Sequence, residues 1–368
     1  MSAGSEPVDV IGMERPELRA WVQTLGEPAF RGDQIFAWLH QRRAASFLEM
    51  TDLPAAFRAR LEETAHITRL PVLRRQVDPK DGTRKYLFQL GDGETVETVL
   101  MRYRHGYSVC VSTQVGCRMG CRFCASTLGG RVRNLETAEI VAQVLEVQRD
   151  LDAEQGRVGH VVVMGMGEPL ENYEAVTRFL RIIHDPRGLG IGWRHMTVST
   201  CGLVPEIRRL ADEGLPVTLA VSLHAPNDYV RRQIMPINAR YPVAQLMDAC
   251  RYYLERTGRR ISFEYIMLAD VNDHPELARE LLILLKGLKC HVNLIPYNPV
   301  AERPFRTSPP QRIQVFRQVL ERGGIPVTVR RSLGRGIDAA CGQLRRAAMR
   351  EKAVHAPAAG PPPGSRSP

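Results

Sequence analysis

The sequence lacks any long apolar stretch. No run approaches the roughly 18 consecutive apolar residues of a membrane-spanning helix. The first ten residues, MSAGSEPVDV, have neither the basic start nor the apolar segment of a signal peptide. We therefore expect a cytoplasmic protein that does not enter a membrane. The eight cysteines of such a protein indicate metal binding or catalysis rather than a disulfide framework.

Lysine is also scarce, since only five of the fifty basic residues are Lys, although the net charge is +10. The basic excess lies towards the C-terminus: residues 1–100 carry a net charge of −2, and residues 301–368 carry +9. A one-sided basic surface is typical of nucleic-acid binding, whereas heavy Arg usage can also reflect codon bias. Candidate phosphate contacts, with a merely solvated face as the alternative, are Arg330, Arg331, Arg335, Arg345 and Arg346.

Length and composition indicate a folded protein with more than one part. The 368 residues are 44% hydrophobic and 24% charged, which excludes a mainly disordered or fibrous chain. Residues 1–75 have the pattern of a small helical domain. Residues 76–348 have short apolar strands. Residues 349–368 are rich in Pro, Gly and Ala and predict a disordered tail.

From about residue 107 the strands alternate with amphipathic helices. Such alternation predicts parallel strands with right-handed crossovers, in a barrel or an open sheet. About six units are too few for a closed barrel of eight. We therefore predict an α/β fold, a partial (β/α)6-type barrel with a strand extension, whose site lies at the C-terminal ends of the strands.

The motif GCRMGCRFCAS follows the first strand of this region and carries Cys117, Cys121 and Cys124. Three thiolates on one short loop can ligate three irons of a cubane iron–sulfur cluster and leave the fourth iron open. An open coordination position is typical of catalytic metal sites. A zinc site completed by a histidine such as His105, and unligated thiols, are the alternatives.

A second motif, MGMGEP, ends an apolar strand. Gly165 and Gly167 would let a ligand approach the backbone, and Glu168 could accept a hydrogen bond from a ligand ammonium group. An ordinary strand-to-helix turn is the alternative.

These motifs resemble those of the RlmN/Cfr family of radical S-adenosylmethionine (SAM) enzymes, which methylate RNA adenines. The similarity extends through MGMGEPLENY, VSLHAPND, MPIN, FEYIML, HVNLIPYNP and DAACGQLR, in the family's order, over about residues 10–348. It implies one [4Fe–4S] cluster on Cys117, Cys121 and Cys124, and two SAM molecules per turnover. The implied SAM contacts are Gly167, Glu168, Ser199, Ser222, Leu223, His224 and Asn298.

The same resemblance implies the catalytic residues. Cys341 matches the family's methyl-carrying cysteine, Cys110 its resolving partner and Glu97 its proton acceptor. Taken alone, either cysteine would be interpreted as a small buried hydrophobic residue and Glu97 as a solvent-facing acid. The remaining cysteines, Cys201, Cys250 and Cys290, match no functional position and are expected in the core.

The resemblance implies methylation of carbon 2 of an adenosine in large-subunit (23S) rRNA, and also of the adenosine next to the anticodon in tRNA. It further implies a monomer that receives electrons from a flavodoxin- or ferredoxin-type donor. Methylation of carbon 8, the Cfr activity that confers antibiotic resistance, is the first alternative. A noncatalytic RNA-binding protein with structural zinc is an alternative of another class.

Overall fold

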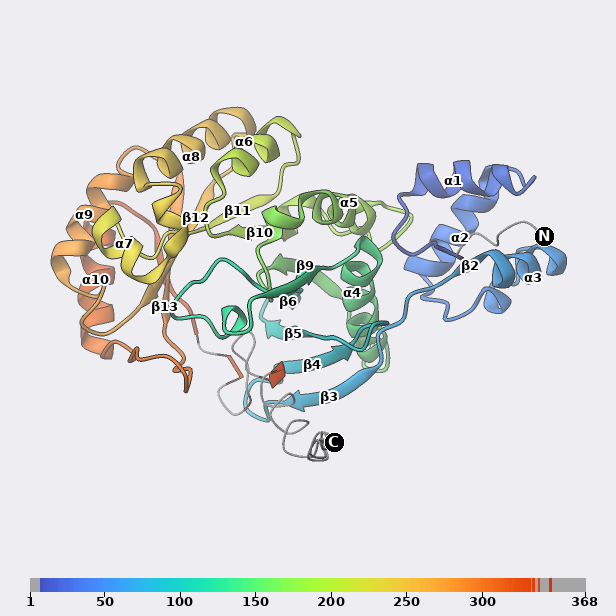
Figure 1. Ribbon diagram of the computed structural model, residues 1–368, viewed down its shortest axis with the longest axis horizontal. Helices are drawn as coiled ribbons and strands as arrows, with labels where there is room; N and C mark the ends of the chain where they lie inside the picture. The colour runs from blue at the N-terminus through green and yellow to red at the C-terminus, as the bar shows by residue number, and fades with distance from the viewer. Residues whose placement is uncertain (1–6, 332, 335–336, 338–343, 346–368) are drawn as a thin grey trace, which may run out of the picture.

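The computed structural model describes residues 7–331, 333–334, 337 and 344–345. Its N-terminal part, on the right in Figure 1, is helical, with α1 (Arg15–Thr24), α2 (Phe30–His40) and α3 (Ala55–Thr64). The short strands β1 (Val8–Asp9) and β2 (Ala65–His66) pair in parallel and join the two ends of this region. The predicted N-terminal helical region is confirmed.

Ion pairs attach this helical region to the rest of the molecule. Arg15 Nε lies 2.9 Å from an Asp185 oxygen, and Arg43 Nε lies 2.7 Å from an Asp152 oxygen. Asp152 ends α4 (Thr137–Asp152), and Asp185 follows α5 (Tyr173–His184). The helical region is therefore attached at the C-terminal ends of α4 and α5.

The core of the remaining chain is one sheet of ten strands, in the order β14-β13-β12-β11-β10-β9-β6-β5-β4-β3. Its antiparallel part comprises β3 (Val72–Val77), β4 (Arg84–Gln89), β5 (Thr95–Tyr103) and β6 (Gly106–Cys110). Its parallel part continues from β6 through β9 (Val158–Val163), β10 (Met196–Thr200), β11 (Thr218–Ser222), β12 (Ile261–Met267), β13 (Cys290–Pro296) and β14 (Val327–Val329).

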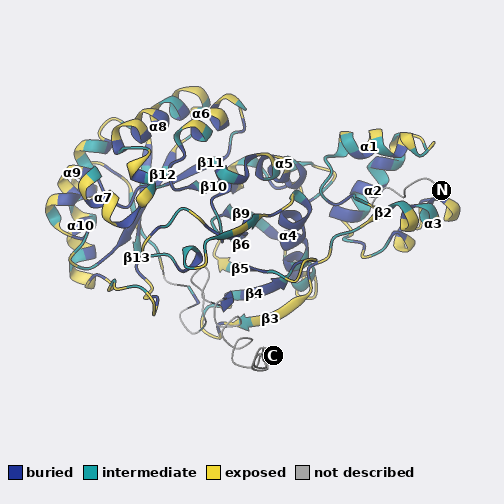
Figure 2. Cartoon of the chain, in the orientation of Figure 1, coloured by how far each residue is buried: buried dark blue, intermediate teal, exposed yellow. Residues whose placement is uncertain are grey.

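Helices connect the parallel strands and cover one face of the curved sheet. After α4 and α5 come α6 (Val204–Asp212), α7 (Asp228–Ile234), α8 (Val243–Thr257), α9 (Pro275–Leu285) and α10 (Pro310–Arg322). Figure 2 shows their buried sides turned towards the strands and their exposed sides towards solvent. A proline in the first turn starts α6, α9 and α10, because its fixed φ suits that position and its missing N–H is not needed there. Six strand–helix units followed by β14 confirm the predicted partial barrel.

Side chains of the antiparallel strands divide between two environments. Tyr86 and Thr98 face α4, where Thr98 Oγ1 donates to Gln143 Oε1 over 2.8 Å. Side chains alternate along a strand, so Lys85 and Glu97 face the opposite side of the sheet. Val99 is paired with both Lys85 and Cys110, which places Cys110 on that same side. This side of β4–β6 is called the inner face below.

Within the described residues, no helix combines the length and apolar character needed to cross a membrane.

Candidate active site at the C-terminal ends of the strands

The three motif cysteines lie on a loop that closes on itself. The loop connects β7 (Gln114–Gly116) to β8 (Arg131–Asn134), which pair antiparallel. Gly116 has φ of +77°, and a Cβ atom there would lie 2.0 Å from the Gly130 carbonyl oxygen. Only glycine fits this contact. The Cys117 N–H donates to the same carbonyl over 2.9 Å, so the loop starts and ends at one point.

The thiols in this loop lie close enough to affect one another's ionisation. Burial raises the pKa of Cys117 to about 12 and that of Cys121 well above its ordinary value, and negative charge on Cys124 raises both further. Thiols of this kind ionise when a metal displaces the proton. Three neighbouring soft ligands from one loop fit three irons of a cubane cluster.

The zinc alternative does not fit the position of its fourth ligand. His105 immediately precedes β6, whereas the cysteine loop begins beyond the far end of that strand. The His105 ring stacks on Tyr103 and lies edge-on to His160, with centroid distances of 5.1 and 4.7 Å.

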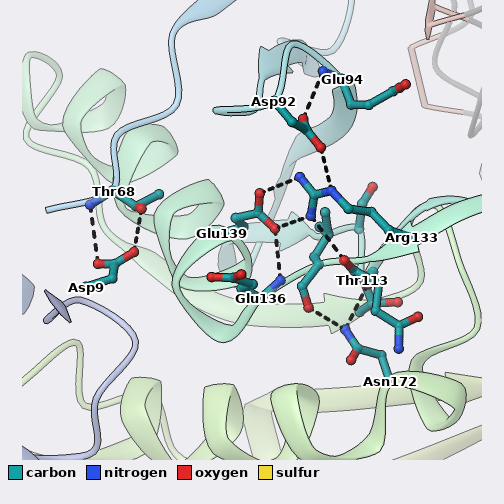
Figure 3. A network of polar contacts seen from close by, with 12 residues as sticks. Asp9, Thr68, Asp92, Glu94, Thr113, Arg133, Glu136, Glu139 and Asn172 are labelled. Atoms are coloured by element: carbon teal, nitrogen blue, oxygen red, sulfur yellow. Dashed lines mark hydrogen bonds and ion pairs between the residues drawn. The ribbon is translucent and has the colours of Figure 1, made fainter. Parts of the chain in front are cut away.

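Polar contacts hold the far side of the loop to the barrel (Figure 3). The Arg133 guanidinium in β8 contacts Asp92 at 2.6 Å and both oxygens of Glu139 at 2.7 and 2.8 Å. This guanidinium is the main cause of the lowered pKa of Asp92. The Asn172 amide donates to the carbonyls of Thr113 and Leu135, which flank the loop and its two strands. The cysteines therefore sit on a segment that is fixed at both ends.

The two glycines of MGMGEP follow β9 and pack directly against the chain that leads to the cysteine loop. A Cβ on Gly165 would lie 2.6 Å from the Val111 carbonyl oxygen, and one on Gly167 would lie 2.7 Å from Gln114 Cβ. Gly167 also has φ of +109°. The protein's own backbone therefore already requires both glycines, which the sequence analysis attributed to ligand approach.

Glu168 is buried beside this turn, and both of its carboxylate oxygens are bound. They accept from the backbone N–H groups of Leu170 at 3.1 Å and Cys201 at 2.7 Å. Burial is the main cause of its raised pKa, which these hydrogen bonds oppose. The charge of Glu168 in turn helps to raise the pKa of Cys117, so the carboxylate and the cysteine loop belong to one site.

The other predicted SAM contacts lie at or near the same edge of the sheet. Ser199 is in β10, Ser222 ends β11, and Leu223 and His224 follow it. Asn298 follows β13 and is exposed. The turn that carries Gly167 and Glu168 is called the Gly-Glu turn below. The cysteine loop, this turn and the other predicted SAM contacts are thus all associated with the C-terminal ends of parallel strands.

His224 connects this edge to the cysteine loop. Its ring is edge-on to Phe123, with centroids 4.9 Å apart, and its Nδ1 accepts the Ile266 N–H over 3.1 Å. Burial lowers the pKa of His224 to about 3, so the ring is neutral near pH 7. The backbone is left-handed, with φ of +59°, which is uncommon for a residue other than glycine.

Arg231 is a structural residue of the site that the sequence analysis missed. The side chain is fully buried and donates to the carbonyls of Leu223 at 3.0 Å and Cys201 at 2.7 Å, and to Asn238 at 3.0 Å. It thereby ties the end of β10 to the end of β11. Its neighbour Asn238 belongs to the MPIN motif, which was the only sequence signal for this contact.

Glu97 and Cys110, two of the three predicted catalytic residues, share the inner face. Glu97 is 3% exposed, which overturns the solvent-facing alternative. Its Oε1 accepts the Arg345 N–H over 2.7 Å, and its Oε2 lies 2.9 Å from Lys85 Nζ. Cys341 lies outside the described residues. Arg345 stands only four positions after it, so the chain that follows Cys341 reaches the inner face at Glu97.

Ser112 joins this face to the Gly-Glu turn. Its hydroxyl donates to the Glu97 carbonyl over 2.6 Å and accepts the Met166 N–H over 3.0 Å. Two hydrogen bonds through one side chain thus connect Glu97 with the turn that carries Glu168.

The structure corrects the prediction for one basic residue at the C-terminal end. Arg345 is largely buried, and its guanidinium binds Glu94 at 2.7 Å, so it does not form part of a solvated or phosphate-facing surface. Arg330 is partly exposed and lies 3.7 Å from Glu264, and Arg331 is exposed. Arg335 and Arg346 lie outside the described residues.

Comparison with known proteins assigns the chain. The profile of the radical SAM superfamily matches residues 111–282, and that of the ribosomal RNA large subunit methyltransferase N-terminal domain matches residues 8–67. A probable dual-specificity RNA methyltransferase RlmN of Symbiobacterium thermophilum is 54% identical over 95% of this chain and 93% of that protein. The chain belongs to the RlmN family. A relative of the same description from Geobacillus kaustophilus is 53% identical over 91% of this chain and 92% of its own length.

A solved structure supports the RlmN-family fold. The crystal structure of a radical SAM methyltransferase from Sphaerobacter thermophilus is similar, with a TM-score of 0.88 and 47% identity over 92% of this chain and 99% of that chain. As a radical SAM protein of the RlmN family, the chain uses a [4Fe–4S] cluster and SAM.

Proposed function

We propose that this chain methylates carbon 2 of a specific adenosine in large-subunit rRNA, and of the adenosine next to the anticodon in tRNA, through an S-methylated Cys341. One observation supports this assignment most strongly. The hydrogen bond from Arg345 to Glu97 brings the chain that follows Cys341 to the face that carries Cys110. A methyl carrier, its resolving thiol and a proton acceptor are all expected at one place.

The target carbon explains why a protein thiol takes part. Carbon 2 of adenine is electron-poor and has no lone pair to attack the methyl group of SAM. The Cys341 thiolate can attack the methyl group of SAM instead. The new S–CH3 bond forms as the methyl–sulfonium bond breaks, and the electron pair of the broken bond stays on the leaving sulfur. When bound, the cluster and a further SAM would supply the 5′-deoxyadenosyl radical that takes a hydrogen atom from the S-methyl group, and the cluster would later take back one electron from the adduct.

The chain's own residues then complete the reaction. The methylene radical on Cys341 adds to carbon 2 of adenine, the adduct gives up its unpaired electron, and the carbon 2 proton passes to a carboxylate oxygen of Glu97. The Cys110 thiolate attacks the Cys341 sulfur, so that an S–S bond forms and the S–CH2 bond breaks. The electron pair of the broken bond stays on the methylene carbon, which takes up a proton to become the methyl group.

The transient disulfide between Cys110 and Cys341 must be reduced by two electrons before the next turnover. A flavodoxin- or ferredoxin-type protein is proposed to supply the electron that the cluster needs for each radical event. We assign the SAM contacts to Gly167, Glu168, Ser199, Ser222, Leu223, His224 and Asn298, and the cluster to Cys117, Cys121 and Cys124.

The N-terminal helices are proposed to help bind RNA, because a base in folded RNA must leave its stack to enter an enclosed site. We assign residues 1–75 to this accessory domain, residues 76–348 to the barrel with its strand extension, and residues 349–368 to a tail. The enzyme is proposed to act as a cytoplasmic monomer.

Analysis of the product RNA tests the proposed function. Ribosomal RNA and tRNA would be taken from cells in which this protein is the only source of the modification, and digested to nucleosides. The nucleosides would be identified by their chromatographic retention time and their mass. We expect 2-methyladenosine in both RNAs. The isomer 8-methyladenosine would instead establish the Cfr activity. Unmethylated RNA, together with stoichiometric zinc in protein kept free of oxygen, would support the noncatalytic zinc alternative.

A further inference from the structure

Lys85 is a buried charged residue that the proposed reaction has not yet used. It lies in β4, its side chain has no exposed surface, and its Nζ is 2.9 Å from Glu97 Oε2. A buried ammonium group is unfavourable unless it is paired and hydrogen-bonded. An apolar side chain would satisfy the same place in a sheet at lower cost, so packing alone does not explain a lysine here.

The direction of the Lys85 side chain separates it from the helix-facing core. Its neighbour Tyr86 points to the other side of the sheet and binds Asp150 of α4. Lys85 is directly opposite Val99 in β5, and Glu97 is two residues away on the same face of that strand. This diagonal arrangement lets a long side chain reach across to the carboxylate.

Glu97 is thereby held from two sides. Lys85 contacts Oε2, while the Arg345 N–H donates to Oε1 over 2.7 Å. The Arg345 guanidinium in turn binds Glu94, three residues earlier on the same hairpin. Contacts to both carboxylate oxygens fix the orientation of this group.

We propose that Lys85 is a positioning residue for the proton acceptor Glu97. This inference rests on the proposed function. In the step concerned, the carbon 2–hydrogen bond of the RNA–protein adduct breaks, the proton goes to Glu97, and the electron pair stays with the adenine ring. Proton transfer requires the acceptor within hydrogen-bonding reach of that proton, and Lys85 holds the carboxylate in place while Arg345 sets its distance from the Cys341 segment.

The test uses the full-length holoenzyme with an RNA substrate and follows three quantities: methylation of Cys341, the covalent RNA–protein adduct, and released methylated RNA. In Lys85→Met, we expect the rate of Cys341 methylation to be within twofold of the rate in the enzyme without substitutions. The adduct should accumulate on denaturing gels, and release of methylated RNA should slow tenfold or more. Glu97→Gln should show the same pattern.

Two further variants separate positioning from folding. Tyr86→Phe changes the adjacent residue of the same strand, whose side chain lies on the opposite face. This variant should release methylated RNA as fast as the enzyme without substitutions. The double variant Lys85→Met/Glu97→Gln removes both members of the ion pair and leaves no unpaired buried charge. It should regain the thermal stability lost in Lys85→Met, yet accumulate as much adduct as either single variant.

The outcomes are distinguishable. Two results would overturn the role of Lys85. In the first, folded Lys85→Met releases methylated RNA as fast as the enzyme without substitutions. In the second, Cys341 methylation and RNA release fall equally and no adduct accumulates. If Glu97→Gln accumulates adduct in that same experiment, the proposed function stands without Lys85. An unmethylated Cys341 in the unmodified holoenzyme would instead overturn the proposed function itself.

Discussion

Cys110 is the last residue of β6 and is 9% exposed. It lies on the inner face, which it shares with Glu97. Burial among strands would suit any small apolar residue. The position gains a chemical meaning only because the chain after Cys341 is bonded to the same face through Arg345. At the residue scale, the account therefore depends on what each buried polar group contacts.

Replacing Cys110 by Ala should stop the reaction at the covalent adduct, because no thiol remains to attack the Cys341 sulfur. We expect an RNA–protein species that survives denaturation and carries Cys341 on its RNA-linked peptide. Cys290→Ala is the matched control, since Cys290 begins β13 far from the proposed chemistry. Free methylated RNA formed at the unmodified rate by Cys110→Ala would remove Cys110 from the mechanism.

His40 should make the protein sensitive to acid. Burial lowers its pKa to about 3, and among the described residues neither ring nitrogen has a hydrogen-bond partner. Below pH 6.5 the unfolded chain gains a proton that the folded chain does not bind, so stability is lost as the pH falls from 6.5 towards 3. At pH 5.5 the loss from this group is about 1.4 kcal/mol.

His40→Leu should therefore reduce the drop in the free energy of unfolding between pH 7.5 and pH 5.5 by about that amount. Denaturant titrations at the two pH values measure it. His274→Leu is the control, because His274 is exposed at the start of α9. An unchanged pH dependence in His40→Leu would show that His40 can be protonated in the folded state.

At the scale of elements, the Gly-Glu turn after β9 shows how closely the site's segments pack. Gly167→Ala should destabilise the turn, because the residue has φ of +109° and the new Cβ would lie 2.7 Å from Gln114 Cβ. We expect a loss of roughly 2–3 kcal/mol in the free energy of unfolding and weaker SAM binding by isothermal titration. Gly129→Ala, which meets no atom within 4 Å, should leave both unchanged. Equal behaviour of the two variants would contradict the packing argument.

The sequence was sufficient to predict the elements and motifs but not the contacts among them. The alternation of strands and helices predicted the partial barrel, and the cysteine spacing predicted a loop of three thiols. It could not show that Lys85 and Glu97 form a buried pair, because the two residues lie in different strands and their contact depends on the register of β4 on β5. Arg231 was missed for a similar reason, since its carbonyl partners come from the ends of two other strands.

Glycine was a residue type for which sequence reasoning found only one of two causes. Gly165 and Gly167 were attributed to the approach of a ligand, and the chain at Val111 and Gln114 also occupies the space that a side chain would need. A close approach between two backbone segments depends on the tertiary fold, and the local sequence contains no signal for it.

At the scale of the whole molecule, the net charge of +10 should make RNA binding strongly dependent on salt. Neutralised phosphates release counterions, so the logarithm of the binding constant falls linearly with the logarithm of the salt concentration. We expect the dissociation constant for an rRNA fragment to rise at least tenfold between 100 and 300 mM salt, measured by fluorescence anisotropy. A salt-independent affinity would contradict a phosphate-based interface.

The central claim is that Cys341 carries the methyl group. The most direct measurement is the mass of the peptide containing Cys341 after expression with iron and purification without oxygen. The account predicts one added methyl group on this peptide, and none in Cys117→Ala, which lacks a ligand of the cluster. An unmodified Cys341 in protein with a full cluster and added SAM would contradict the account.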